Sequence, residues 1–282
     1  MMCIILKVGF VKSSHGGEEF DMNKSFEIIK KDLLEIGLVS GDTVIVHSSL
    51  SSMGNVEGGA ETVIAALMEV IGPEGTLMFP AFTYKSAYLG EPFVHDETPV
   101  CVGLIPETFR KWPGVIRSVH PSHSVSAIGR LAYELTKDHA LDETPMGLNS
   151  PYRRLAEHKA KILMLGCSLN TMSYMHALEE EAEAEYCLTP NYVEYTITDD
   201  KGVRYTKKYR KHNFRRPTET IKQCYARLIN ILTPESDYIA RKIHGATSYL
   251  VDAVALHDKA LLKFKESPYY FVDAPGHENH QL

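Results

Sequence analysis

The sequence has few cysteines, no long apolar run and no excess of positive charge. Its five cysteines are an odd number and form no C-x-x-C pair. This spacing excludes a disulfide framework and the usual zinc sites, and it favours a reducing compartment. The opening MMCIILKVGF is too short an apolar run to span a membrane, and the polar VKSSHGGEEFD follows it without a small-residue cleavage site. We therefore expect a cytoplasmic protein that does not engage a membrane.

The charge balance argues against a nucleic-acid partner. The formal net charge is -6 and the pI about 6.1, whereas proteins that neutralise phosphates carry a basic surface. A small cationic partner suits this surface better. With 282 residues, 44% hydrophobic and 23% charged, the chain has the composition of a globular protein and can bury a large core.

The most informative stretch runs from Val44 to Thr83. It reads as an apolar strand, a Ser- and Gly-rich loop, an amphipathic helix and a second apolar strand, which is a βαβ unit. Such a loop can bind phosphate groups with backbone N–H groups and the positive end of the following helix. It lacks the lysine of a P-loop and the G-x-G-x-x-G of a dinucleotide fold, so neither ATP nor NAD is supported. From the residues alone, an anion-binding loop and an ordinary βα turn both stay open.

Hydrophobic periodicity predicts the remaining elements. Apolar residues at helical spacing predict helices, and short apolar or alternating runs predict strands. The predicted helices are Asn23–Gly37, Glu61–Ile71, Leu104–Trp112, Leu131–Thr136, Pro151–Glu157 and Arg216–Ile231. The predicted strands are Thr43–Val46, Thr76–Phe79, Ser124–Ile128 and Ala160–Leu165, with a hairpin over Tyr192–Tyr209 and a strand–helix–strand over Ile243–Val272. Residues 85–99 are predicted to form a long loop.

These elements predict an α/β fold with a mixed, mostly parallel sheet flanked by helices and a β-hairpin insertion. We expect residues 1–22 to be a weakly ordered N-terminal extension or the product of an upstream start, residues 23–273 to form a single domain and residues 274–282 to form a tail. In open α/β sheets ligands gather at the carboxyl ends of the strands, so the loops after Val46 and Leu165 are the places to look for a site.

His176 is the sharpest candidate for chemistry. Ser173, His176, Glu179 and Glu180 share one face of a helix just past a strand end, and a carboxylate one turn from an imidazole can orient the ring of a general base. A solvated acidic stripe on a surface helix fits the spacing about equally well. No second histidine follows at helical spacing, so no metal site is expected. His120 and His123, which flank Pro121, fit structural hydrogen-bonding roles better than catalytic ones.

Six motifs in order carry a resemblance to a known family. They are HSSLSSMG, GGAETVIAAL, PEGTLMFPAFT, HPSHSVSAIG, NSPYRRL and LGCSLNTMSYMHALEE. Together they resemble the aminoglycoside 3-N-acetyltransferases, the antibiotic N-acetyltransferase group whose fold differs from that of the GNAT acetyltransferases. The similarity runs from about Lys24 to Val272.

The resemblance implies acetyl transfer from acetyl-CoA to the 3-amino group of a 2-deoxystreptamine aminoglycoside, and with it antibiotic resistance. The family's T-x-x-H-x-x-E pattern maps onto Ser173, His176 and Glu179, with serine in place of threonine. His176 would be the base, Glu179 its orienting partner or a substrate contact, and Ser173 a donor to the thioester carbonyl.

The same resemblance implies a coenzyme A site at the strand ends. Its predicted residues are His47, Ser48, Ser49, Leu50, Ser51 and Ser52 in the first loop, Thr76, Pro80, Phe82 and Thr83 along the second strand, and Ser122, His123, Ser124 and Val125 on the opposite wall.

The acceptor is less well defined by the sequence. Aminoglycosides are polycations, and the acidic residues Asp96, Glu97, Asp142, Glu143 and Glu179 to Glu185 could meet them. The basic segment from Lys207 to Arg216 fits the phosphates of coenzyme A or a solvated turn. The alternatives are acyl transfer to a different amine and a CoA-binding protein without catalysis. A serine hydrolase is a weaker rival because no G-x-S-x-G elbow is present. A homodimer is left open.

Overall fold

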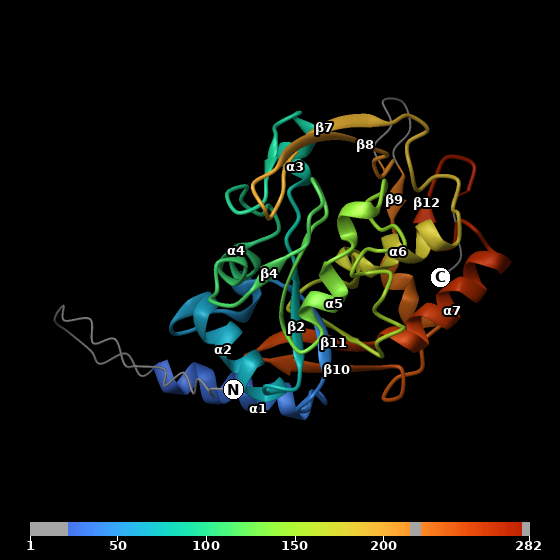
Figure 1. Ribbon diagram of the computed structural model, residues 1–282. Helices are drawn as coiled ribbons and strands as arrows, with labels where there is room; N and C mark the ends of the chain where they lie inside the picture. The colour runs from blue at the N-terminus through green and yellow to red at the C-terminus, as the bar shows by residue number, and fades with distance from the viewer. Residues whose placement is uncertain (1–21, 215–220, 278–282) are drawn as a thin grey trace.

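A seven-stranded mixed sheet forms the centre of the protein (Figure 1). The computed structural model describes residues 22–214 and 221–277. The strands lie in the order β10-β11-β6-β1-β2-β5-β4. Their bounds are β1 Thr43–Ser48, β2 Thr76–Pro80, β4 Ile116–Arg117, β5 Val125–Gly129, β6 Lys161–Leu165, β10 Tyr238–Ile243 and β11 Ala246–Asp252.

The centre of this sheet is parallel and its flanks are antiparallel. β1 pairs in parallel with both β2 and β6, whereas β5 and β11 run against their neighbours. Consequently β10, β6, β1, β2 and β4 point one way, and only β11 and β5 point the other. The predicted mixed, mostly parallel sheet is confirmed, and the carboxyl ends of β1, β2 and β6 meet at one edge.

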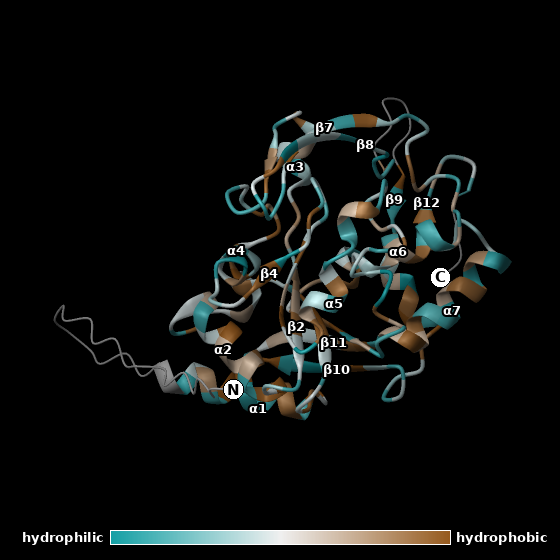
Figure 2. Ribbon diagram, viewed as in Figure 1, coloured by the Kyte–Doolittle hydropathy of each residue, from teal (hydrophilic) through white to brown (hydrophobic). Residues whose placement is uncertain are grey.

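Alternate residues of the central strands face two separate cores. Val44 and Val46 pack with α1 (Met22–Glu35), α2 (Gly59–Ile71) and α4 (Leu104–Arg110), whereas Ile45 faces the core that contains α6 and α7. The second face is covered by α5 (Ala132–Thr136), α6 (Tyr174–Glu181) and α7 (Ala253–Glu266). In Figure 2, brown and teal stretches alternate along α1 and α7, as expected of helices with one apolar side. Helices on both faces explain why the central strands are apolar throughout.

Smaller elements surround the edge where the parallel strands end. A three-stranded sheet combines β3 (Phe93–Val94), β7 (Val193–Thr198) and β8 (Arg204–Tyr209), and lies with α3 (Tyr84–Tyr88) at the top of Figure 1. A two-stranded sheet pairs β9 (Lys222–Gln223) with β12 (Val272–Asp273). The 3-10 helices are η1 (Leu50–Met53), η2 (His139–Leu141), η3 (Leu169–Thr171) and η4 (Tyr225–Asn230).

Three predictions of local structure are wrong. Residues 151–157 form consecutive turns instead of a helix. The described part of 216–231 contains β9 and the 3-10 helix η4 in place of an α-helix. The predicted loop over 85–99 contains most of α3 and all of β3, which pairs with the hairpin strand β7. The predicted N-terminal extension lies almost entirely outside the described residues.

Within residues 22–214 and 221–277, no helix combines the length and apolar character needed to cross a membrane.

Candidate active site

The first turns of α6 place a histidine and a glutamate side by side. His176 and Glu179 are three residues apart, so they lie on the same helix face. The Nδ1 atom of His176 is 2.9 Å from Oε2 of Glu179. The glutamate is fully buried, and the histidine side chain is 14% exposed. Because a carboxylate only accepts hydrogen bonds, Nδ1 carries the hydrogen and Nε2 keeps a free lone pair. The predicted orientation of an imidazole by a carboxylate therefore has the right geometry.

Two tyrosines complete the surroundings of the buried carboxylate. The Tyr225 hydroxyl donates to Oε2 of Glu179 at 2.8 Å, and the Tyr186 hydroxyl donates to Oε1 at 3.1 Å. Burial, followed by the nearby Glu179 charge, raises the pKa of both phenols well above the ordinary range. Both tyrosines therefore stay protonated and act as donors. Neither residue was predicted, because both reach Glu179 through the tertiary fold.

The second nitrogen of His176 faces the segment before η4. The Gln223 side-chain nitrogen lies 3.3 Å from Nε2 of His176, so its amide donates to the free lone pair. The Tyr225 hydroxyl lies 3.0 Å from Nδ1. Residues 223 and 225 thus contact both nitrogens of the imidazole, although they lie 47 and 49 positions further along the chain.

Neutral aromatic rings pack around the imidazole of His176. Its ring stacks on His212, with centroids 4.5 Å apart, and lies 4.8 Å from Phe214. The ring of His123 lies edge-on to that of His212, with the centroids 4.9 Å apart. Burial is the main cause that lowers the pKa of His123 and His212 well below the ordinary value, and the neighbouring His176 adds to it. These rings therefore form a neutral polar wall at physiological pH.

Tyr152 links the ends of two parallel strands to the start of α6. Its hydroxyl lies 3.4 Å from Nε2 of His47 at the end of β1, and it hydrogen-bonds the side chain of Ser173. Its ring is 5.9 Å from that of Phe82, just after β2. Burial lowers the pKa of His47 to about 4, so this imidazole is neutral. The predicted His47, Phe82 and Ser173 are therefore brought together by a tyrosine for which no role was predicted.

The serine loop lies over the end of β6. The Ser49 backbone N–H donates to the Leu165 carbonyl at 2.9 Å, and the Ser49 and Ser52 hydroxyls are 2.7 Å apart. Gly166 has φ +65°, and a Cβ there would come within 3.0 Å of the Ser52 Cβ. Only glycine fits this close approach without strain. The Ser48 hydroxyl is buried and has no partner among the described residues.

A cavity of about 520 Å³ opens at this same edge. Strand β11, the residues that follow β6, the serine loop and the 3-10 helices η3 and η4 contribute to its walls. Its lining residues are Ser52, Gly166, Cys167, Ser168, Leu169, Ala226, Ile229, Gly245, Ala246, Thr247 and Tyr249. The volume is in the range of small-molecule and cofactor sites. Of the predicted coenzyme A residues, Ser52 is the one that lines it.

Thr76 does not belong to this edge. It begins β2 and pairs with Thr43, the first residue of β1, so it lies at the amino end of the parallel strands. Its hydroxyl accepts from the Leu131 backbone N–H. Pro80, at the other end of β2, pairs with Val125. Our prediction that Thr76 lines the same strand end as Pro80 is not compatible with this register.

The other predicted wall residues are mostly engaged in structural contacts. The Thr83 hydroxyl donates to the Pro121 carbonyl at 2.7 Å, and the Ser122 hydroxyl lies 2.8 Å from Nδ1 of His123. The Ser124 hydroxyl donates to the Ala81 carbonyl at 2.8 Å. The His123 ring contacts the ring of His212, which in turn stacks on His176.

One group of side chains has metal-binding donor types. Glu180, Cys187 and His212, which we call the Cys187 cluster, bring one ligand atom each within 4.8 Å of one another. Oε1 of Glu180 lies 2.9 Å from Nε2 of His212 and accepts from the Met146 backbone N–H. A soft divalent ion fits this donor set, but the hydrogen bonds already satisfy the glutamate and the histidine.

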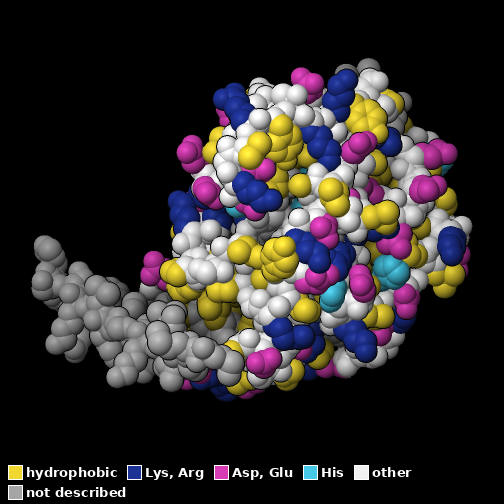
Figure 3. All heavy atoms as spheres, in the orientation of Figure 1, with side chains coloured by type: hydrophobic (Ala, Val, Ile, Leu, Met, Phe, Trp, Pro, Cys, Tyr) yellow, Lys and Arg dark blue, Asp and Glu magenta, His cyan; other side chains and the backbone are white. Residues whose placement is uncertain are grey.

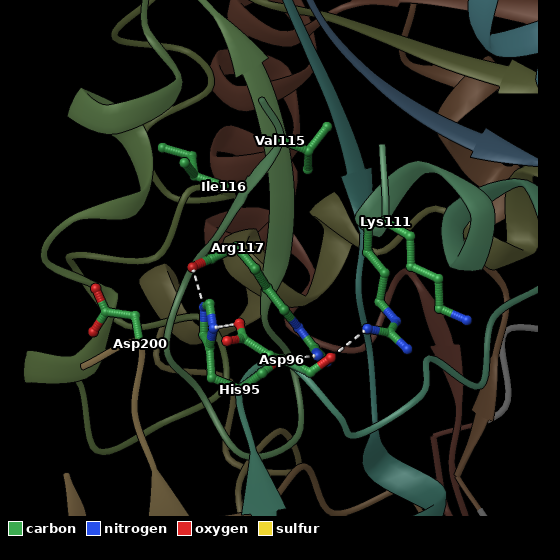
Figure 4. Close-up of a pocket in the computed structure, with 8 residues that line it drawn as sticks. His95, Asp96, Lys111, Val115, Ile116, Arg117 and Asp200 are labelled. Carbon is green, nitrogen blue, oxygen red and sulfur yellow. Dashed lines mark hydrogen bonds and ion pairs between the residues drawn. The ribbon is translucent and has the colours of Figure 1, made fainter. Parts of the chain in front are cut away.

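A second cavity, of about 300 Å³, lies against β4. Figure 4 shows the imidazole of His95 between the Asp96 side chain and the Arg117 carbonyl. The buried Arg117 guanidinium donates to Ser124 Oγ and to the carbonyls of Ala81, His95 and Thr98. Burial lowers its pKa to about 9. Four of the five N–H groups of the guanidinium donate to other residues of the protein, so we interpret this cavity as a structural junction.

Acidic and basic side chains are intermingled on the face of the molecule shown in Figure 3. This distribution agrees with the modest net charge, and on this face it does not resemble the basic stripe of a nucleic-acid-binding surface.

Comparison with known proteins gives consistent matches. An aminoglycoside N(3)-acetyltransferase IX from Micromonospora chalcea is 38% identical over 173 residues, which cover 55% of this chain and 61% of that protein. The corresponding type VII protein from Streptomyces paromomycinus is 35% identical over 193 residues, covering 62% of this chain and 67% of that protein. The matched part of this chain thus spans about three fifths to two thirds of these relatives.

Solved structures match over a larger share of the chain. A binary complex of AAC-IIIb with CoASH has a TM-score of 0.73 at 26% identity, covering 86% of this chain and 96% of that one. A histidine-to-alanine mutant of AAC(3)-IVa in complex with a gentamicin has a TM-score of 0.75 at 25% identity, covering 93% and 95%.

The family model described as aminoglycoside 3-N-acetyltransferase matches residues 45–265. This range includes the carboxyl ends of β1 and β6, the serine loop, and the His176–Glu179 pair of α6, which we call the dyad. The chain therefore belongs to the aminoglycoside 3-N-acetyltransferase family.

Proposed function

We propose that this protein is a cytoplasmic acetyltransferase that moves the acetyl group of acetyl-CoA to the 3-amino group of a 2-deoxystreptamine aminoglycoside. The observation that carries the proposal is the pairing of His176 with Glu179 at 2.9 Å. It leaves Nε2 of an imidazole that is 14% exposed as the proton acceptor. A CoA-binding protein without catalysis has no need of such a base.

His176 acts as the general base. Its Nε2 takes a proton from the acceptor amine, which displaces the Gln223 amide, while the amine nitrogen forms a bond to the thioester carbonyl carbon. The C–S bond then breaks, and the same proton passes from Nε2 to the departing thiolate. Glu179 stabilises the imidazolium between these transfers. A positioned base contributes roughly 10²–10⁴-fold to such reactions.

Ser173 is placed to act on the carbonyl oxygen. It lies at the N-cap of α6, three residues before the base, and its side chain makes no capping hydrogen bond. Held by Tyr152, its hydroxyl can donate to the oxygen as negative charge develops there. The serine keeps the hydroxyl of the family's threonine.

The 520 Å³ cavity at the strand ends is the proposed coenzyme A site. Two features of the cavity wall fit a long polar ligand: the exposed Ser52 and the close approach of the chain at Gly166. The unpartnered Ser48 hydroxyl belongs to the same serine loop. The related AAC-IIIb structure, which contains CoASH, supports the choice of donor. We propose His47, Ser48, Ser49, Leu50, Ser51 and Ser52 for this site, with Pro80, Phe82 and His123 towards the reacting end.

Several predicted acceptor contacts are already used by the protein. Asp142 caps the Asn149 backbone, Glu180 belongs to the Cys187 cluster, and Glu181 pairs with Arg153 and His257. The AAC(3)-IVa complex with a gentamicin supports a polycationic acceptor for this chain.

Thiol release from acetyl-CoA across a panel of aminoglycosides tests the proposal, with His176→Ala and the exposed His277→Ala as matched variants. We expect release that depends on an aminoglycoside, falls by about 10²-fold or more in His176→Ala and is kept in His277→Ala. Calorimetry should show CoA binding nearly intact in both variants. If no aminoglycoside of the panel causes thiol release although CoA binds, the acceptor is a different amine. Full turnover in His176→Ala would remove His176 from the mechanism.

A further inference from the structure

The contacts of the buried carboxylate raise a question that the dyad alone does not answer. Glu179 is fully buried, and its one ion pair with a described residue is to His176. A buried carboxylate is costly unless several donors satisfy it. Here the donors are the Nδ1–H of His176 and the hydroxyls of Tyr186 and Tyr225. The two phenols and His176 therefore donate hydrogen bonds to the same negatively charged carboxylate.

The two phenols differ in what else they touch. Tyr186 binds only the Oε1 side of the carboxylate, at 3.1 Å, whereas Tyr225 binds Oε2, the oxygen that also accepts from His176. The Tyr225 oxygen is 2.8 Å from Oε2 and 3.0 Å from Nδ1. While this hydroxyl donates to Glu179, its lone pair faces the Nδ1–H of the imidazole. Tyr225 therefore favours the tautomer that carries hydrogen on Nδ1.

We propose that Tyr225 is a positioning residue that holds His176 in its Nδ1–H form. Together with Tyr186, it also weakens the electrostatic stabilisation that Glu179 gives to the protonated imidazole. This inference rests on the proposed function for its kinetic consequences, but the hydrogen-bond network can be tested without turnover. The phenol is well suited to the task because burial and the Glu179 charge raise its pKa, so it remains a donor at any working pH.

The proposal predicts different effects for the two phenols. Removing either hydroxyl leaves the negative charge of Glu179 less dispersed, which favours the protonated imidazole. Removing Tyr225 also takes away the contact with Nδ1, so a larger fraction of His176 adopts the wrong tautomer or a rotated ring. The first effect is a shift along the pH axis, and the second is a lower plateau rate.

The experiment compares three Tyr→Phe variants at 174, 186 and 225. Tyr174 is the matched control, since it lies on α6, the helix that carries His176. Its buried hydroxyl has no hydrogen-bond partner in the described part of the chain. NMR of labelled histidine gives the titration midpoint of His176, identified by the signal missing in His176→Asn. Kinetics give kcat and the acidic limb of kcat/KM.

In Tyr225→Phe we expect the His176 midpoint and the acidic limb to move to higher pH by about half a unit or more. We also expect kcat to fall about 10-fold, within what a positioned base contributes. Tyr186→Phe should shift the midpoint in the same direction with a smaller loss of kcat, and Tyr174→Phe should do neither. The proposal is overturned if Tyr225→Phe leaves the midpoint unchanged or if Tyr174→Phe reproduces its effects. Absence of turnover in the native protein would overturn the proposed function, while the NMR midpoints would still decide the role of Tyr225.

Discussion

Acid should destabilise this protein well before its carboxylates protonate, because its core contains neutral histidines. His139 is fully buried, with Nδ1 lying 2.8 Å from the Ser118 hydroxyl. Burial lowers the pKa of His139 to about 3 and that of His47 to about 4. In the unfolded chain both imidazoles titrate near the ordinary value of ~6.5.

The sign and size of the effect follow from these values. Below pH ~6.5 the unfolded chain binds protons that the folded protein does not, so the free energy of unfolding falls as the pH falls. Each group contributes its full stabilisation above ~6.5 and loses it progressively towards its folded pKa. At pH 5.5 each histidine costs about 1.4 kcal/mol, so His47 and His139 together cost about 3 kcal/mol.

Other buried groups add to this loss or oppose it. His120, His123 and His212 also have pKa values lowered by burial, and they act in the same direction. Asp142 and Glu180 have pKa values raised by burial, so they favour the folded state as the pH falls. A single-site variant is therefore needed to isolate one histidine.

Urea unfolding at pH 7.5 and pH 5.5 provides the assay, with His139→Asn and the exposed His277→Asn compared with the native protein. We expect the stability difference between the two pH values to shrink by about 1.4 kcal/mol in His139→Asn and to stay unchanged in His277→Asn. A native protein equally stable at both pH values, or a His139→Asn variant that keeps the whole difference, would refute the reasoning.

Three further predictions follow from the two cavities and the Cys187 cluster. Arg117→Met should lower the free energy of unfolding by about 3 kcal/mol, since it leaves buried carbonyls without a donor. Replacement of an exposed arginine, Arg204→Met, should leave the free energy of unfolding near the native value in urea melts. Equal losses in the two variants would argue against the structural role of Arg117. Ser52→Trp should weaken CoA binding in calorimetry by filling the cavity, whereas Ser40→Trp, beyond the other end of β1, should not; an unaltered dissociation constant in Ser52→Trp would move the coenzyme elsewhere. Dialysis against a chelator should change neither turnover nor melting temperature, because hydrogen bonds satisfy the glutamate and histidine of the Cys187 cluster, and a loss restored by zinc would contradict this.

The sequence predicted the central sheet and the dyad because both depend on local spacing. Strands β1, β2 and β6 are near-continuous apolar runs, and the i, i+3 relation of His176 and Glu179 follows from helix geometry alone. The error at Thr76 is of a different kind. Its strand was predicted correctly, but the direction of the strand places its first residue at the far edge from the serine loop.

The partners of the dyad could not be predicted in this way. Tyr225 and Gln223 reach His176 from a segment that was predicted to be helical. His212 reaches it from the basic segment that was predicted to bind the phosphates of coenzyme A or to form a solvated turn. Their hydrogen bonds and ring contacts with His176 connect positions between 36 and 49 residues apart, and no periodic pattern encodes such separations. For the contact of Ser173, by contrast, the sequence did offer a signal. Tyr152 belongs to the NSPYRRL motif that carries the family resemblance, but no role was predicted for this tyrosine.

The pairing of β9 with β12 links the surroundings of His176, the proposed base, to the order in which the chain is made. Gln223, which contacts Nε2 of His176, pairs with Val272 near the C-terminus. The helix with the histidine and glutamate leaves the ribosome about ninety residues before β12 does. The surroundings of His176 are therefore completed only after β12 has been synthesised and has paired with β9.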